Sequence, residues 1–252
     1  MTQGLSLNHL YFTNIIGITS EASQCIGLDL SRSHHQASPA PSVSPHYTQD
    51  VAVVKIDASK IDPSSFPGNA IDLVSTKFPF EVLTSLMCPN PRNTHNFSYP
   101  LDRLLRLRGT ITDDEMRRPT TYDWNNNPCI IVLKRGKTSG LTVGCANNVF
   151  SYTRKYLGDN NIGISKEWAI LPFDAWTGGS HDFSAKDFSA KGDSGSVVVD
   201  GAGRIGGLIT CGGGKTDFID ITYVTPIGLI LKTIRNNKSL ARSYPKSGPS
   251  TY

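Results

Sequence analysis

The sequence predicts an all-β protein built around an antiparallel barrel or sandwich, with a helix at its C-terminal end. Three observations support this class. Short apolar stretches recur after residue 128, glycine-rich turns separate them, and the chain has 23 Gly and 15 Pro in 252 residues. This content is typical of a turn-rich β protein and is too low for a collagen-like or low-complexity chain. It also argues against a helical bundle.

Six short strands are predicted in the second half of the chain. They cover residues 129–134, 141–146, 168–172, 196–200, 204–210 and 218–224. The turn residues at 200–203 predict a hairpin between the fourth and fifth of these strands. Apolar residues at positions 227, 230, 231 and 234 have helical spacing, which predicts a terminal helix over 227–240 packed on the sheet.

The first half is less regular. Residues 5–61 hold short apolar runs interrupted by a polar, proline-rich loop, and residues 50–56 form their clearest predicted strand. From 62 to 127 the chain carries turn signals and short helical patterns. In one of these, Thr112 and Glu115 have capping-box spacing, and Pro119 ends the predicted helix within two turns. We interpret this stretch as a connecting segment.

Composition and charge exclude several classes of function. The net charge of +4 is dispersed, and we interpret its one local cluster, Arg103, Arg106 and Arg108, as a solvated face and not as a nucleic-acid footprint. The longest uninterrupted apolar run, 129–133, is far shorter than the ~18 residues of a membrane span. We therefore expect neither a nucleic-acid partner nor a membrane-spanning segment.

The cysteines and the amino terminus predict an intracellular location, in the cytoplasm or nucleus. The chain has 5 Cys, an odd number without a CxxC pair, and most lie in apolar strand-like runs, as buried free thiols do. The first basic residue is Arg32, so the basic region of a secretory signal is absent.

Two segments ending in Gly-Lys-Thr fail as nucleotide-binding loops. The phosphate-binding motif needs a glycine five residues before its Gly-Lys pair, but those positions are Ile131 and Ile209. We expect no nucleotide binding.

The strongest motif is Gly-Asp-Ser-Gly-Ser at 192–196. A serine among small residues, reached from a loop and followed by an apolar strand, has an exposed hydroxyl beside backbone N–H groups that can bind an oxyanion. The alternative is a simple Gly-Ser turn leading into a hairpin. The nucleophile elbow of α/β-hydrolases does not fit, because Ser196 replaces its second glycine and a strand follows.

A serine nucleophile needs a base and a carboxylate that orients the base. Asp50 stands at the start of the predicted strand 50–56, where it is either such a carboxylate or a simple turn residue. His9 ends an apolar strand-like run, whereas the other five histidines lie in predicted loops. Taken alone, His9 also fits a structural role.

Three blocks in the order His, Asp, Ser resemble the triad blocks of the chymotrypsin-like, trypsin-fold serine peptidases. They are His9 after Leu-Ser-Leu-Asn, the strand beginning Asp-Val-Ala-Val at Asp50, and the motif at 192–196. The stretches 134–144 and 222–227 are similar to those of the disulfide-poor, non-secreted branch found in fungal trypsin-like proteins. The resemblance covers nearly the whole chain and is weakest over 62–127.

The resemblance implies two six-stranded antiparallel β-barrels with the active site in the cleft between them. Ser194 would be the nucleophile, His9 the general base and then acid, and Asp50 the group that orients the imidazole. The amides of Gly192 and Ser194 would form the oxyanion hole. Asp193 would be buried and would hold the loop.

The resemblance also implies a peptide or protein substrate, with neither a metal ion nor an organic cofactor. Thr210, Cys211 and Gly212 would bind the substrate backbone as an added β-strand. Phe188 would form the base of a shallow apolar pocket for small or medium hydrophobic side chains, with Asp187 facing the opposite way.

Only eight residues precede His9, where the family has about two strands, so we expect an incomplete first barrel. The expected organisation is a partial barrel over 1–65, a connecting segment over 66–127, and a second barrel with the terminal helix over 128–252. The expected function is a serine endopeptidase that acts through an acyl-enzyme. The alternative is a protease-fold pseudoenzyme that binds peptides without cleaving them.

Overall fold

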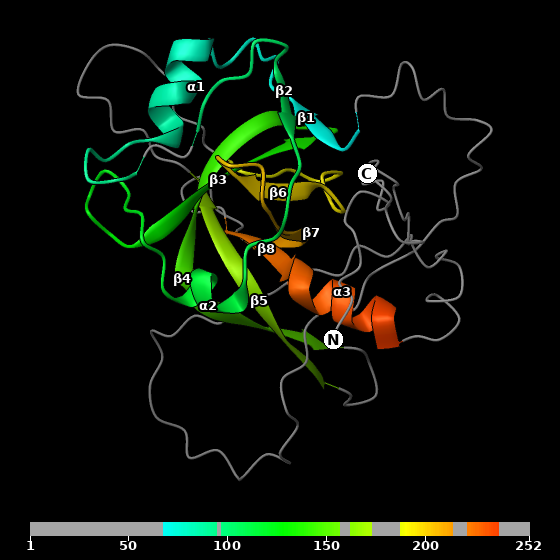
Figure 1. Cartoon of the computed structure of the whole chain (residues 1–252). Coiled ribbons are helices and arrows are strands. Elements are labelled where there is room, and N and C mark those ends of the chain that lie inside the picture. Colours follow the sequence, from blue (N-terminus) through cyan, green and yellow to red (C-terminus); the bar gives the residue numbers. More distant parts are fainter. Residues whose placement is uncertain (1–67, 95–96, 157–161, 173–186, 214–220, 237–252) are drawn as a thin grey trace, which may run out of the picture.

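A computed structural model describes residues 68–94, 97–156, 162–172, 187–213 and 221–236 (Figure 1). Within these residues six strands form a closed antiparallel barrel in the order β3-β4-β5-β8-β7-β6. The strands are β3 (Cys129–Gly136), β4 (Gly140–Tyr156), β5 (Ile162–Pro172), β6 (Val197–Asp200), β7 (Ile205–Gly213) and β8 (Ile221–Pro226). The predicted antiparallel barrel is confirmed, as is the hairpin between β6 and β7. The predicted first barrel at 1–65 lies outside the described residues.

Strands β4 and β5 are much longer than predicted, and β3 and β7 are each longer by two residues. β4 continues ten residues past the predicted end, and β5 pairs with it along this extension, from Phe150 opposite Trp168 to Tyr156 opposite Ile162. The polar pair Asn147-Asn148 has the composition of a turn. The structure instead has a register shift between Ala146 and Phe150, so a bulge absorbs the two asparagines and pairing resumes beyond them.

The C-terminal helix is confirmed in position and orientation. Helix α3 (Ile227–Asn236) follows β8 directly, and its buried side chains are Ile227, Ile230 and Ile234. These three positions lie on one face of a helix, and this face packs into the same core as the barrel strands.

The described part of the predicted connecting segment also covers the barrel. It contains β1 (Ala70–Asp72), α1 (Phe80–Met87), β2 (Leu104–Arg106) and α2 (Asp113–Arg117), with β1 and β2 paired. Figure 1 shows α1 and the β1–β2 pair at one end of the barrel and α3 near the other. Buried residues from β1, α1 and β2 share a core with barrel residues, among them Ile71, Leu73, Leu83, Leu86, Leu105, Leu133, Val143 and Val199. The segment is therefore part of the folded core.

The predicted capping box is present at the start of α2. The Thr112 hydroxyl accepts a hydrogen bond from the Glu115 amide at 3.3 Å, and Glu115 Oε2 accepts one from the Thr112 amide at 2.9 Å. The bond from the Thr112 amide, together with the ion pair to Arg204, lowers the pKa of Glu115 to about 2. Glu115 thus stays ionised, and remains a capping acceptor, at ordinary pH.

Replacing Thr112 with alanine should lower the free energy of unfolding by about 1 kcal/mol, because the Glu115 amide loses its side-chain acceptor. Urea denaturation measures this change. Thr120→Ala is the control, since it removes an exposed hydroxyl outside the cap. Equal unfolding midpoints for the two variants would contradict the prediction.

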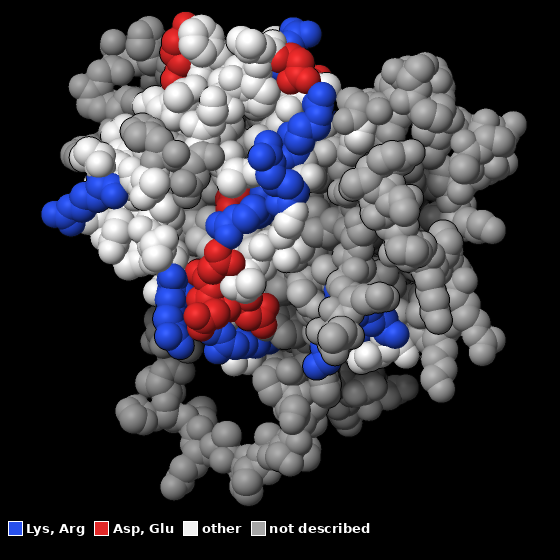
Figure 2. Space-filling view, viewed as in Figure 1, with Lys and Arg blue, Asp and Glu red and all other residues white. Residues whose placement is uncertain are grey.

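One arginine of the cluster predicted to be a solvated face, Arg106, has a carboxylate partner, as does Arg204 outside the cluster. Arg106 pairs with Asp102 at 2.9 Å, and Arg204 pairs with Asp200 at 2.8 Å. Figure 2 shows Lys and Arg side chains on this face lying next to Asp and Glu side chains. Among the described residues, no helix is both long enough and apolar enough to span a membrane.

Candidate active site

Ser194 lies on an exposed loop that leads into β6, as the sequence predicts. We call residues 190–196 the Ser194 loop. The loop is anchored to β7, because the Gly195 amide donates to the Ile209 carbonyl at 2.7 Å and the Ile209 amide donates to the Ser196 carbonyl at 3.0 Å. The Ser194 hydroxyl lies 3.5 Å from the Thr210 carbonyl, a long hydrogen bond that leaves Oγ available for other contacts.

Three amides of the Ser194 loop, those of Lys191, Gly192 and Ser194, have no hydrogen-bond acceptor among the described residues. The amides of Asp193 and Ser196 donate at 3.0 Å to the carbonyls of Ala190 and Asp193, but those of Gly192 and Ser194 donate to no described atom. Gly192 has φ of 101°, a left-handed conformation that favours glycine. The two amides predicted to form an oxyanion hole therefore make no hydrogen bond to the part of the chain that the structure describes.

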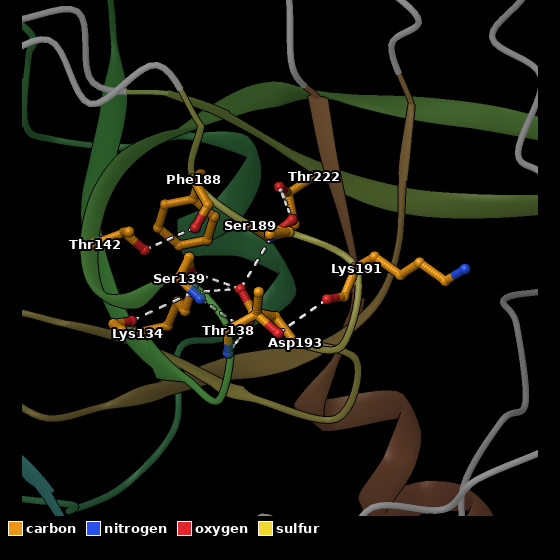
Figure 3. Close-up of polar contacts among 11 residues, drawn as sticks. Lys134, Thr138, Ser139, Thr142, Phe188, Ser189, Lys191, Asp193 and Thr222 are labelled. Atoms are coloured by element: carbon orange, nitrogen blue, oxygen red, sulfur yellow. Dashed lines mark hydrogen bonds and ion pairs between the residues drawn. The ribbon is translucent and has the colours of Figure 1, made fainter.

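Asp193 holds the loop from inside the protein, as expected. Its side chain has no exposed surface. The carboxylate accepts hydrogen bonds from Lys134 Nζ at 2.8 Å, from the Ser139 hydroxyl at 2.5 Å, and from the amides of Thr138 at 2.8 Å and Ala190 at 3.0 Å (Figure 3). Burial alone raises the pKa of Asp193, but these donors outweigh it and hold the pKa well below its usual range. Asp193 is thus a buried carboxylate anion.

Lys134, Thr138 and Ser139 are the site residues that sequence reasoning missed. Lys134 is on β3 and is completely buried, while the other two lie in the turn between β3 and β4. The Thr138 hydroxyl also donates to the Lys191 carbonyl at 2.9 Å, and the Ser139 amide donates to Asp193 at 3.3 Å, so this turn makes four hydrogen bonds to the Ser194 loop. A lysine directly after five apolar strand residues was the available signal, since a buried ammonium requires a buried acidic partner.

The predicted substrate strand lies beside Ser194. β6 pairs with β7 only as far as Leu208, whereas β8 pairs with β7 up to Gly213. A register shift between Ile209 and Cys211 makes Thr210 a bulge residue, and the Thr210 carbonyl is the one near the Ser194 hydroxyl. On the side away from β8, no described strand pairs with residues 210–213. Among the described residues this edge is therefore unpaired, as strand addition requires.

The prediction for the cysteines is wrong in one case. Cys88, Cys129 and Cys145 are free thiols, as expected, but Cys211 is disulfide-bonded. The sequence pattern does not distinguish it, because Cys211 lies in the same kind of apolar strand as Cys129 and Cys145.

Phe188 does not form an exposed pocket base. Its ring has no exposed surface and packs in the barrel core, where a Cβ atom on Gly144 would lie only 2.6 Å from Phe188 Cδ2. Its carbonyl accepts a hydrogen bond from the Thr142 hydroxyl at 2.7 Å, which fixes the segment leading to the Ser194 loop. Asp187 is exposed, so the predicted alternation of these two side chains holds, but Phe188 is a core residue and does not present a surface to substrate.

The remaining predicted residues, His9 and Asp50, lie outside the described residues, as do all six histidines. The structure thus brings together Ser194, the amides of Gly192 and Ser194, and the β7 edge with Thr210, Cys211 and Gly212. It does not place the base or its orienting carboxylate.

A scan against protein-family models and a search of curated proteins found no match to this chain. Within the part of the chain that the structure describes, no three or more His, Cys, Asp or Glu side chains are grouped so that they could hold a metal ion.

Proposed function

We propose that the protein is a chymotrypsin-like serine endopeptidase with Ser194 as its nucleophile. One observation carries the proposal: an exposed serine lies beside two backbone amides that have no acceptor among the described residues, on a loop fixed by a buried carboxylate. Available amides next to a serine hydroxyl are the arrangement that stabilises the oxyanion of acyl transfer. In this proposal the protein has two barrels, and the closed barrel of strands β3 to β8 is the C-terminal one.

In the proposed reaction the substrate lies along the β7 edge, where Thr210 and Gly212 offer backbone groups to an added strand. Ser194 Oγ attacks the scissile carbonyl carbon, and its proton passes to His9, which Asp50 orients. The amides of Gly192 and Ser194 donate to the resulting oxyanion. The leaving amine takes the proton from His9, and water then hydrolyses the acyl-enzyme by the same steps.

A second candidate function is peptide binding without cleavage. The β7 edge at 210–213 favours it, because strand addition at this edge needs neither a nucleophile nor a base. The two functions differ in one property, which is whether the Ser194 hydroxyl is activated.

A fluorophosphonate probe distinguishes them, since it forms a covalent adduct only with an activated nucleophile. We expect wild-type protein to be labelled, Ser194→Ala to be unlabelled, and the control Ser85→Ala, which changes an exposed serine on α1, to be labelled like wild type. Labelling that survives in Ser194→Ala would refute the nucleophile assignment. An unlabelled wild type that still binds peptides would favour the second function.

A further inference from the structure

We infer that Lys134 is a positioning residue of this site: its buried ammonium holds, through Asp193, the loop that presents the amides of Gly192 and Ser194. The effect of Lys134 on catalysis rests on the proposed function, whereas its effect on the loop does not. The inference follows from an ion pair between residues 59 positions apart, Lys134 on β3 and Asp193 in the Ser194 loop.

The ion pair is completely buried. Both side chains have no exposed surface, and Lys134 Nζ lies 2.8 Å from Asp193 Oδ2. The same ammonium also contacts the Ser139 hydroxyl, which itself donates to Asp193. A buried ammonium and a buried carboxylate are each very unfavourable alone, so each fixes the position of the other.

Asp193 in turn fixes the orientation of the amides of Gly192 and Ser194. It stands in sequence between Gly192 and Ser194, so the direction of its side chain constrains both neighbouring peptide planes. Its carboxylate bonds to the Ala190 amide on one side and to the Thr138 amide on the other, which ties the Ser194 loop to the β3–β4 turn. Gly136 leaves the space that the pair occupies, because a Cβ atom there would collide with the Asp193 carboxylate.

Loss of the ammonium should therefore displace the loop while leaving the substrate edge intact. Without its counter-ion, the Asp193 carboxylate is driven to take up a proton or to turn toward solvent, and either change moves the flanking peptides. Residues 210–213 are held separately by β8. Since the amides act on charge that develops in the transition state, kcat should fall and KM should change little.

The test compares Lys134→Met, which keeps the stem and removes the charge, with Lys137→Met, which removes an exposed lysine from the same turn. We expect Lys134→Met to lower the fluorophosphonate labelling rate and kcat by ~100-fold, the loss typical of one oxyanion donor, with KM within about threefold of wild type. Amide hydrogen exchange at 192–196 should accelerate in Lys134→Met. Lys137→Met should match wild type in every measurement.

Folding and function are separated by two further readouts. All rates are expressed per folded molecule. If Lys134→Met does not fold, Ser139→Ala takes its place, because it removes one donor to Asp193. Ser139→Ala should lower kcat by a smaller factor, roughly fivefold, and should accelerate amide exchange at the same residues. The inference would be overturned if Lys134→Met folds and has the amide exchange and kcat of wild type. Where Ser139→Ala is used instead, exchange and kcat equal to those of wild type would overturn it. If wild type itself is inactive, the proposed function fails and hydrogen exchange alone decides the role of Lys134.

Discussion

Peptide hydrolysis should fall by at least ~10⁴-fold when Ser194 is replaced by alanine, because the acyl-enzyme cannot form without Oγ. The barrel should be unaffected, since the Ser194 side chain is exposed and its only described contact is the long one to the Thr210 carbonyl. Cleavage of a peptide library followed by mass spectrometry measures the loss, with equal circular dichroism spectra confirming the fold.

The control for hydrolysis is again Ser85→Ala, which should cleave the library at the wild-type rate. Peptide affinity offers a second comparison, because strand addition at residues 210–213 does not require the hydroxyl. Ser194→Ala should bind library peptides with nearly unchanged affinity. Wild-type rates of cleavage in Ser194→Ala would show that another residue is the nucleophile.

Replacing Asp193 with alanine should destabilise the protein by about 3–5 kcal/mol, the usual cost of leaving a buried ion without its partner. The Lys134 ammonium would keep no opposite charge at 2.8 Å, and the amides of Thr138 and Ala190 would lose their acceptor. Urea unfolding measures the change. Asp187→Ala is the matched control, because Asp187 is an exposed aspartate in the segment just before the Ser194 loop and should stay within about 0.5 kcal/mol of wild type.

The difference in unfolding free energy between wild type and Asp193→Ala should also depend on pH. An exposed aspartate has a pKa of about 4, and hydrogen bonds lower the pKa of Asp193 in the folded state. A lowered pKa means that the stabilisation is fully present above about pH 4 and is lost as the pH falls through the folded-state value. The difference in unfolding free energy should therefore be constant from pH 5 to 7 and shrink below pH 4. A difference that grows in acid would contradict this assignment.

Local signals predicted most of the barrel. Runs of β-branched residues marked the six strands, and the Thr112–Glu115 spacing marked α2 because a capping box is formed by residues close in sequence. The length of β4 was not predictable in the same way. Its extension is stabilised by pairing with β5 across a bulge, which is a property of two strands and not of either alone.

In the candidate site, too, features set by neighbouring residues could be predicted, and contacts between distant residues could not. The exposed Ser194 and its neighbouring glycine follow from a five-residue motif, so the sequence located them. The Lys134–Asp193 pair joins positions 59 residues apart, and nothing local to either residue identifies its partner. Phe188 was misinterpreted because alternation along a strand predicts which side chains face inward, not whether an inward side chain lines a pocket or fills the core.

The most direct test of the central claim is to locate the fluorophosphonate adduct on the wild-type chain. Trypsin cleavage after Lys191 and Arg204 releases residues 192–204, which contain the two serines Ser194 and Ser196. Fragmentation of this peptide in a mass spectrometer should place the phosphonate on exposed Ser194 and leave buried Ser196 unmodified. An adduct on any other residue, or no adduct on a folded protein at saturating probe, would contradict the account.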